Sequence, residues 1–304
     1  MRRLGVAVAS ATAGAVVLAG VTITVTRQAP SSSQSLQQAP PARLAEPEPP
    51  GPIPSSPPRF ATPPPAADTE TAERAQEAAQ EVVPGAQLSI AVFDRETDLA
   101  VTETDVDRQV PCMSVVKLFI ALDVIERSPG GMPDPATVGR LHEMLKNSDD
   151  DIASGFWTTN GGPAIIARTA ERIGLTNTVV PADDPGQWGD VLSTPHDLTT
   201  TYRHITERLS PPARDFVLDA LGHASRMVEG FNQHFGIPEG VDDRPWVVKQ
   251  GWGTSGSQAV MNTTGTVGPG SRYIVVVMAT AGSYTSLPRA VTAAVRTLGP
   301  TLDG

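Results

Sequence analysis

The sequence predicts an α+β domain of the α/β/α sandwich type, with an antiparallel sheet built from both chain ends and an inserted all-helical lobe. Two strand-like segments come early, at 87–93 and 99–102, and the chain from about 115 to 221 is helical apart from its loops. The later strand-like segments are 246–249, 258–267 and 272–279, and the flanking helices are 69–82 and 287–298. The sheet must therefore join segments that lie far apart in the sequence.

The first helix and the first two strands are indicated by composition and by alternation. Residues 69–82 are rich in Ala, Glu and Gln, and Pro84-Gly85 ends the helix. Residues 87–93 alternate in the way that is typical of a strand. A polar turn at 94–98 leads into 99–102, so these two strands are expected to form a hairpin.

A helix at 115–125 is predicted to lie in the middle of the protein. Its residues are apolar on every side, and only Lys117 and Asp123 interrupt them. A helix that is apolar all round must be covered on all sides by other elements. Pro111 prevents the helix from extending backwards, which places Ser114 at or near its first turn.

The other helices of the lobe are bounded by residues that break helices. Residues 136–146 carry apolar side chains at the spacing of one helical face. The polar run 147–151 ends that helix and caps the next one. A helix at 164–174 stops at a glycine, and prolines begin two more helices at Pro195 and Pro211.

Composition narrows the class of protein. The chain has 304 residues, and its formal net charge of −10 argues against nucleic acid as a partner and against a polybasic membrane patch. The single cysteine, Cys112, excludes an internal disulfide and is expected to be a small buried hydrophobe. The five histidines show no H-E-x-x-H spacing, so neither a metal nor a cofactor is predicted.

Three regions are predicted along the chain: 1–27, 28–68 and 69–304. The first has a basic start and an uncharged apolar stretch long enough to span a bilayer, and it is expected to be an uncleaved signal-anchor rather than a removed signal peptide. The second is a Pro-rich disordered linker, interpreted as a spacer rather than a PxxP docking peptide. The third is the folded domain, expected at the outer face of the cytoplasmic membrane, or secreted if the first region is cleaved. Lipid attachment at an N-terminal cysteine is excluded, because Cys112 is the only cysteine.

Ser114 and Lys117 give the first chemical signal. They are three residues apart, so they share one face of a helix about one turn apart. An ammonium in a buried helix is costly unless it is paired or loses its proton. A neutral lysine beside a serine hydroxyl at a helix N-terminus can activate that hydroxyl as a nucleophile. The alternative is a capping serine beside a lysine that extends to solvent.

Two later motifs follow Ser114-Val115-Val116-Lys117 in order. Ser148-Asp149-Asp150 lies in a break between helices, and Lys249-Gln250-Gly251 closes a predicted strand. Together the three motifs resemble S-x-x-K, S-D-N and K-T-G, the set found in penicillin-binding proteins and class A β-lactamases. The resemblance covers about residues 69–302 and includes a proline three residues before the serine, Gly161-Gly162-Pro163 and Ser193-Thr194-Pro195.

The resemblance implies a role for each matching residue. Ser114 would attack the carbonyl of a β-lactam or a D-alanyl-D-alanine peptide, and Lys117 would take its proton. Ser148 would pass a proton to the leaving nitrogen, and Lys249 would attract the substrate carboxylate and support that transfer. The backbone N–H groups of Ser114 and Trp252 would form the oxyanion hole. The residues expected to bind substrate are Asp150, Gln250, Gly251 and Thr254, the last as an alternative hydroxyl donor.

Three departures from the family pattern bear on activity. Asp150 stands where the family has asparagine, and a carboxylate there tends to keep Lys117 protonated. Gln250 replaces the threonine or serine that helps bind the substrate carboxylate, and the bulky Trp252 narrows the same rim. The loop at 176–194 lacks the family's glutamate that activates the deacylating water, and its only carboxylates are Asp183, Asp184 and Asp190.

Three functions remain open from the sequence. The leading hypothesis is acyl transfer through Ser114 that leaves a persistent acyl-enzyme with β-lactams or D-alanyl peptides. The second is an efficient β-lactamase in which Asp184 or Asp190 activates water. The third is a catalytically silent binding module that keeps the pocket. The expected partner is a small-molecule or peptidoglycan-peptide substrate, and the protein is expected to be a monomer.

Two further signals are interpreted as structural. The G-x-G-x-x-G match at 251–256 is rejected as a nucleotide site, because a strand rather than a helix is expected to follow it. The tryptophans expected to serve in packing are Trp157, Trp188 and Trp246.

Overall fold

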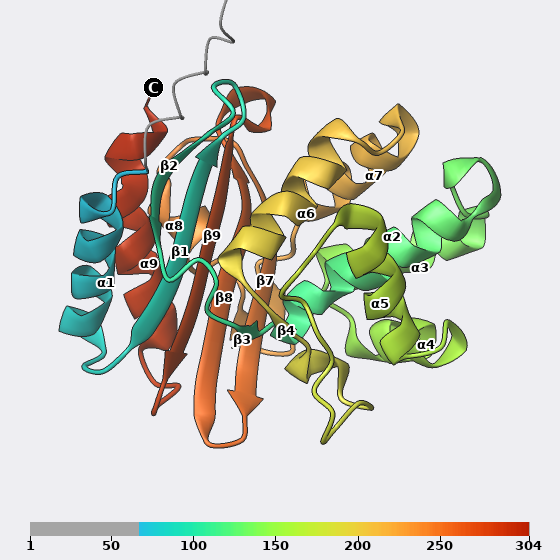
Figure 1. The fold of residues 1–304 in the computed structure, drawn as a ribbon, viewed down its shortest axis with the longest axis horizontal. Helices are drawn as coiled ribbons and strands as arrows, with labels where there is room; N and C mark the ends of the chain where they lie inside the picture. Colours follow the sequence, from blue (N-terminus) through green and yellow to red (C-terminus); the bar gives the residue numbers. More distant parts are fainter. Residues whose placement is uncertain (1–66, 304) are drawn as a thin grey trace, which may run out of the picture. The chain divides into compact units, whose positions relative to one another are not determined.

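The computed structural model describes residues 67–303, so the predictions for 1–27 and for most of the linker at 28–68 lie outside the described residues. The described part forms three layers, with a sheet between two groups of helices (Figure 1). Helices α1 (Glu70–Val82) and α9 (Leu287–Leu298) pack together on one face, and the helical lobe lies on the other. The predicted α+β class is confirmed. Among residues 67–303, no helix is both long enough and apolar enough to cross a bilayer.

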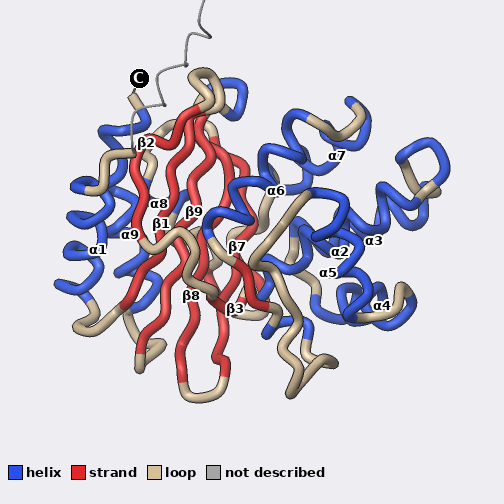
Figure 2. The backbone as a smooth tube through the Cα atoms, in the orientation of Figure 1, coloured by secondary structure: helices blue, strands red, loops and turns tan. Residues whose placement is uncertain are grey.

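The sheet has five strands in the order β2-β1-β9-β8-β7, and every neighbouring pair is antiparallel. Figure 2 shows these strands as one continuous layer with helices on both sides. The N-terminal hairpin joins the C-terminal strands through β1 and β9, where Gln87 pairs with Thr280 and Asp94 with Tyr273. The strand bounds are β1 (Gln87–Asp94), β2 (Leu99–Thr104), β7 (Trp246–Ser255), β8 (Gln258–Val267) and β9 (Tyr273–Ala281).

Strand β9 separates two hydrophobic cores. All of its residues are buried, because helices cover the sheet on both faces. Successive side chains of a strand point to opposite faces. Val275 and Val277 accordingly join the core beneath α1 and α9, whereas Val276 and Met278 join the core of the helical lobe.

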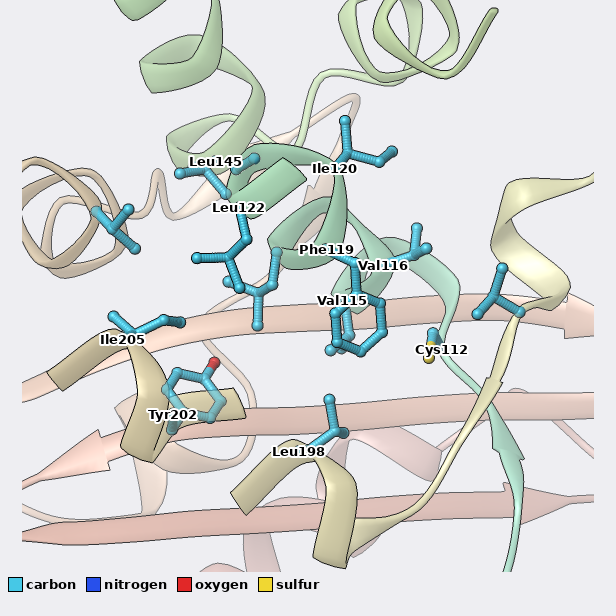
Figure 3. Packing of buried hydrophobic residues seen from close by; sticks show 14 of the residues in the cluster. Cys112, Val115, Val116, Phe119, Ile120, Leu122, Leu145, Leu198, Tyr202 and Ile205 are labelled. Atoms are coloured by element: carbon cyan, nitrogen blue, oxygen red, sulfur yellow. The ribbon is translucent and has the colours of Figure 1, made fainter. Parts of the chain in front are cut away.

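The helical lobe is built around α2, which begins at Lys117 directly after the short 3₁₀ helix η1 (Met113–Val116). Figure 3 shows side chains of η1 and α2 gathered with Leu198, Tyr202 and Ile205 of α6. The buried position of Cys112 in this core is as predicted. The lobe helices are α2 (Lys117–Arg127), α3 (Pro135–Lys146), α4 (Asp150–Thr159), α5 (Pro163–Ile173), α6 (Pro195–Glu207) and α7 (Pro211–Gly222).

The second polar residue of the central helix, Asp123, is satisfied by an ion pair inside the lobe. Its side chain is fully buried and accepts two hydrogen bonds from the guanidinium of Arg168 on α5, at 2.8 and 2.7 Å. Arg127 lies 3.3 Å from the same carboxylate. The carboxylate therefore ties α2 to α5.

Several short elements are not indicated by the sequence. Strand β3 (Val110–Pro111) pairs with β4 (Leu192–Ser193), and β5 (Met227–Val228) pairs with β6 (Phe231–Asn232) in a small hairpin. Helix α8 (Ile237–Gly240) follows this hairpin. Each of these elements is too short for a hydrophobic period to be recognised.

Candidate active site

Ser114 lies at the sharp entry to α2. It belongs to η1, so it precedes the α-helix by one 3₁₀ turn instead of occupying the first α-helical turn. Met113, the residue before it, has a φ of +49°, in the left-handed region that is unfavourable for a side chain other than glycine. Outliers of this kind persist where surrounding structure enforces them, and they concentrate at functional sites. The Ser114 side chain remains 8% exposed, which is enough to open on a cavity.

Lys117 points into this site and not to solvent. Its side chain is fully buried, and its Nζ lies 2.7 Å from the Ser114 hydroxyl oxygen. The same nitrogen lies 2.9 Å from the Ser148 carbonyl oxygen and 2.5 Å from a carboxylate oxygen of Asp150. The alternative of a lysine that extends outward beside a capping serine is therefore wrong.

Ser148 connects the two lysines of the site. Its Oγ lies 3.3 Å from the Nζ of Lys117 and 2.9 Å from the Nζ of Lys249. Ser148 has a φ of +52°, and this left-handed turn before α4 directs both its hydroxyl and its carbonyl toward Lys117. The three separated motifs thus meet around one hydroxyl.

Lys249 lies in the middle of β7, whereas the sequence places it at the end of a shorter strand. The strand continues to Ser255 through two glycines, which weaken the sequence signal of a strand. The Thr264 hydroxyl on β8 donates to the Lys249 carbonyl at 2.7 Å, and the Tyr202 hydroxyl lies 2.9 Å from that threonine oxygen. The lysine backbone is therefore held from both the sheet and α6.

Burial shifts the acid–base properties of both lysines in the same direction. It lowers the pKa of Lys117, and the nearby Asp150 charge opposes that effect. Burial places the pKa of Lys249 well below its ordinary value, and the neighbouring Lys117 charge lowers the Lys249 pKa further. A lowered pKa increases the fraction of neutral amine at a given pH, and the neutral amine is the form that can accept a proton from a serine.

Gly251 lets β7 approach the turn that carries Ser114. A Cβ at this position would collide with the carbonyl oxygen of Cys112 and would stand 3.3 Å from the Cβ of Met113. The absence of a side chain therefore allows β7 to pass directly against η1. This close contact places β7 against the turn that carries Ser114, and the N–H groups of Ser114 and Trp252 remain the predicted oxyanion hole.

The side chains of Gln250 and Thr254 lie away from the site, in contrast to the sequence-based expectation. Gln250 is 1% exposed, and its amide donates to the carbonyl oxygens of Gln233 and Phe235 at 3.0 and 2.6 Å. It points to the opposite face of β7 from Lys249, because neighbouring strand residues alternate. Thr254 is exposed near the β7–β8 turn and does not line the cavity beside Ser114.

The cavity beside Ser114 has a volume of about 310 Å³. The β5–β6 hairpin forms one of its walls, with Met227, Val228 and Glu229, and the sequence analysis missed all three. Met227 is 56% exposed at this rim. The other lining residues are Ser114, Asn147, Ser148, Asp149, Asp150 and Trp252.

The loop at 176–194 contributes an aromatic side chain to the site. None of the three aspartates of this loop lines the cavity. The ring of Trp188 instead lies over the Nζ of Lys117, 4.7 Å from the ring centroid, and its indole N–H donates to the Ser154 hydroxyl at 3.2 Å. Trp188 therefore contacts Lys117 in addition to any packing role that the sequence predicted for it.

Comparison with known proteins identifies the family of this chain. The model of the Beta-lactamase enzyme family matches residues 133–299. The chain belongs to the β-lactamase enzyme family. The expected membership in the β-lactamase family is thereby confirmed. A relative named "Putative lipoprotein LppW", from Mycobacterium tuberculosis and from Mycobacterium bovis, is 35% identical over 224 residues, covering 71% of this chain and 70% of its own.

Solved structures of a β-lactamase and of PBP-A share the fold of this chain. The β-lactamase from Streptomyces albus G superposes with a TM-score of 0.62 at 20% identity, covering 76% of this chain and 99% of its own. PBP-A superposes with a TM-score of 0.59 at 19% identity, covering 78% and 97%. A PBP-A mutant in an acyl-enzyme complex with penicillin G gives a TM-score of 0.60 at 19% identity, covering 78% and 98%.

Proposed function

We propose that this domain carries out acyl transfer through Ser114, with β-lactams or D-alanyl-D-alanine peptides as acyl donors. The observation that carries the proposal is the 2.7 Å separation between the Lys117 Nζ and the Ser114 Oγ at a buried position. The lowered pKa of Lys117 suits a base. The catalytic residues are Ser114, Lys117, Ser148 and Lys249.

The contacts define a route for each proton. As the Ser114 Oγ bonds to the substrate carbonyl carbon, its proton passes to the Lys117 Nζ. The tetrahedral oxyanion is stabilised by the backbone N–H groups of Ser114 and Trp252. When the carbonyl carbon–nitrogen bond breaks, the leaving nitrogen takes the proton of the Ser148 hydroxyl. A proton from Lys117 then restores Ser148, since Ser148 contacts both lysines.

The acyl-enzyme formed in this way is expected to persist. The loop at 176–194 places no carboxylate at the cavity, and Trp188 covers Lys117 from the side of that loop. Hydrolysis of the ester requires a base beside water, and neither Asp184 nor Asp190 lines the cavity where an acyl group would lie. This arrangement favours a protein that is acylated once over an efficient β-lactamase.

The placement of the domain in the cell forms part of the proposal. The relative of this chain is named as a lipoprotein, whereas the single cysteine here, Cys112, is fully buried. We therefore assign attachment to the apolar segment at 1–27, with the linker at 28–68 holding the domain of 69–304 outside the membrane as a monomer. Its substrate is then a small molecule or a cell-wall peptide.

The decisive experiment follows the mass of the purified domain during incubation with a fluorescent penicillin. We expect one stable adduct, absent in Ser114→Ala and retained in the control Ser210→Ala, which removes an exposed hydroxyl that makes no capping bond. Rapid loss of the adduct with release of hydrolysed product would instead establish a β-lactamase. Absence of an adduct at every time point would establish a silent binding module and overturn the proposal.

A further inference from the structure

We propose that Asn262 is a positioning residue of the Ser114 site, which holds the bend at Met113 and thereby aims the Ser114 N–H group, one of the two proposed oxyanion donors. The inference rests on the proposed acyl transfer and adds a residue that the three sequence motifs do not contain. Two features carry it: the hydrogen bonds of the Asn262 side chain, and the unfavourable backbone that lies between those bonds and Ser114.

Asn262 lies in β8 and directs its side-chain amide at the chain that leads to Ser114. The side chain is fully buried, and its Nδ2 donates to the carbonyl oxygens of Pro111 and Cys112 at 2.8 and 3.1 Å. The reversed orientation of the carboxamide would place its oxygen against two carbonyl oxygens, which have no proton to donate. In the orientation observed, the side-chain oxygen has no hydrogen-bond partner within residues 67–303. The two donated bonds therefore persist although they leave a buried acceptor unpaired, which is unfavourable.

The two carbonyl groups belong to the last peptide units before the bend at Met113. The Cys112 carbonyl also accepts from the Val115 N–H at 3.1 Å, and the Cys112 N–H donates to the Val191 carbonyl at 2.7 Å. With these units fixed, the φ angle of Met113 decides where the next peptide unit, which carries the Ser114 N–H, points. Its value of +49° is unfavourable for a residue with a side chain, so surrounding contacts must hold the bend. The carboxamide from β8 supplies two such contacts.

The place of Asn262 in the sheet explains how it reaches this turn. Asn262 pairs with Gly251 of β7, and directly opposite residues of an antiparallel pair lie on the same face. Gly251 has no side chain, and a Cβ there would collide with the Cys112 carbonyl oxygen. The same carbonyl group therefore receives a hydrogen bond from β8 and finds room beside β7. The bend before Ser114 is thus held by both strands.

Acylation kinetics and the carbonyl vibration of the adduct test this role. Asn262→Leu replaces the amide by an apolar group of similar shape, and we expect the rate constant for acylation by benzylpenicillin to fall by about a hundredfold. The dissociation constant of the preceding non-covalent complex should stay within about twofold, because the oxyanion forms only in the transition state. Infrared difference spectra with an isotope-labelled β-lactam carbonyl should place the ester carbonyl of the Ser114 adduct at higher wavenumber, since a misaimed N–H donates a weaker hydrogen bond.

Two further variants grade the effect and control for it. Asn262→Asp keeps the shape with at most one donor, so its acylation rate should lie between those of the wild type and Asn262→Leu, and it decides the question if Asn262→Leu does not fold. The control is Thr266→Val. Thr266 is buried on the same strand and face as Asn262, and its hydroxyl has no partner in the described part of the chain. Its acylation rate and carbonyl frequency should match those of the wild type.

The outcomes separate this inference from the proposed function. Acylation of the folded Asn262 variants at the wild-type rate overturns the inference while the acyl transfer stands. A slower rate that comes entirely from a weaker non-covalent complex, or a carbonyl frequency that neither Asn262 variant changes, does the same. A wild-type protein that forms no Ser114 adduct overturns the acyl transfer, and the inference falls with it.

Discussion

Replacing Asp150 by asparagine tests whether Lys117 is the base of the proposed acyl transfer. The Asp150 carboxylate stabilises the protonated form of Lys117, because its oxygen lies 2.5 Å from the lysine Nζ. Burial acts in the opposite direction and lowers the Lys117 pKa. Removing the carboxylate charge therefore lowers that pKa further and increases the fraction of free amine at any pH below it. Acylation is expected to accelerate on the acidic side of the profile.

The magnitude follows from the geometry of the pair. The Asp150 side chain is 62% exposed, so the dielectric of water sets the scale of its interaction with Lys117. Two unit charges 2.5 Å apart in water interact by about 1.7 kcal/mol. Side-chain motion and salt reduce this value. Since about 1.4 kcal/mol corresponds to a tenfold change, acylation at acidic pH is expected to rise by about five- to tenfold.

The assay is the pH dependence of adduct formation with a fluorescent penicillin in wild type and Asp150→Asn. The control is Asp151→Asn, an equal charge change at an exposed neighbouring position that makes no contact with the lysine. Asp150→Asn should raise the acidic limb and leave the alkaline plateau near its wild-type value. An unmoved profile, or one displaced to higher pH, would show that Lys117 is not the base.

Three further predictions concern the supports of the site. Gly251→Ala should slow acylation by about a hundredfold, because the added Cβ forces β7 away from the turn that carries Ser114. The control Gly139→Ala adds a Cβ that meets no atom, so it should keep the acylation rate and raise the free energy of unfolding in urea by about 0.5–1 kcal/mol. Equal acylation rates in the two variants would contradict the proposed close contact. Asp123→Asn should lower the free energy of unfolding by about 2–3 kcal/mol. The loss is smaller than for a fully buried ion pair because the Arg168 side chain is 31% exposed. A loss below about 0.5 kcal/mol would refute a stabilising role for this ion pair. Trp188→Leu removes an aromatic face that favours the charged lysine and should accelerate acidic acylation about two- to fivefold; slower acylation there would argue against the contact.

The sequence predicted the frame of the site because its signals are local. An apolar helix interrupted by Lys117, a helix break at Ser148 and a strand at Lys249 can each be recognised within about ten residues. Their order along the chain then indicated a family, and the structure brings the three together around one hydroxyl. The strand was predicted too short because Gly251 and Gly253 interrupt its pattern.

The direction of individual side chains was less predictable. Gln250 was expected at the rim, but strand alternation and two backbone carbonyls hold it on the far face. Trp188 was expected only to pack, yet the loop places its ring over Lys117. In both cases the deciding partners lie 15 or more residues away, and no local pattern identifies them.

The amino-acid sequence by itself determined which groups can do the chemistry: one hydroxyl, two amines and a second hydroxyl, each on an element of recognisable type. Tertiary structure alone decided what surrounds them, namely the β5–β6 hairpin with Glu229 and Met227, the ring of Trp188 over Lys117, and Trp252 at the cavity wall. The physical reason is the separation along the chain between the residues that interact. Helix and strand periodicity arises from neighbouring residues, whereas the charge and access of a cavity depend on segments that meet only when the whole chain packs.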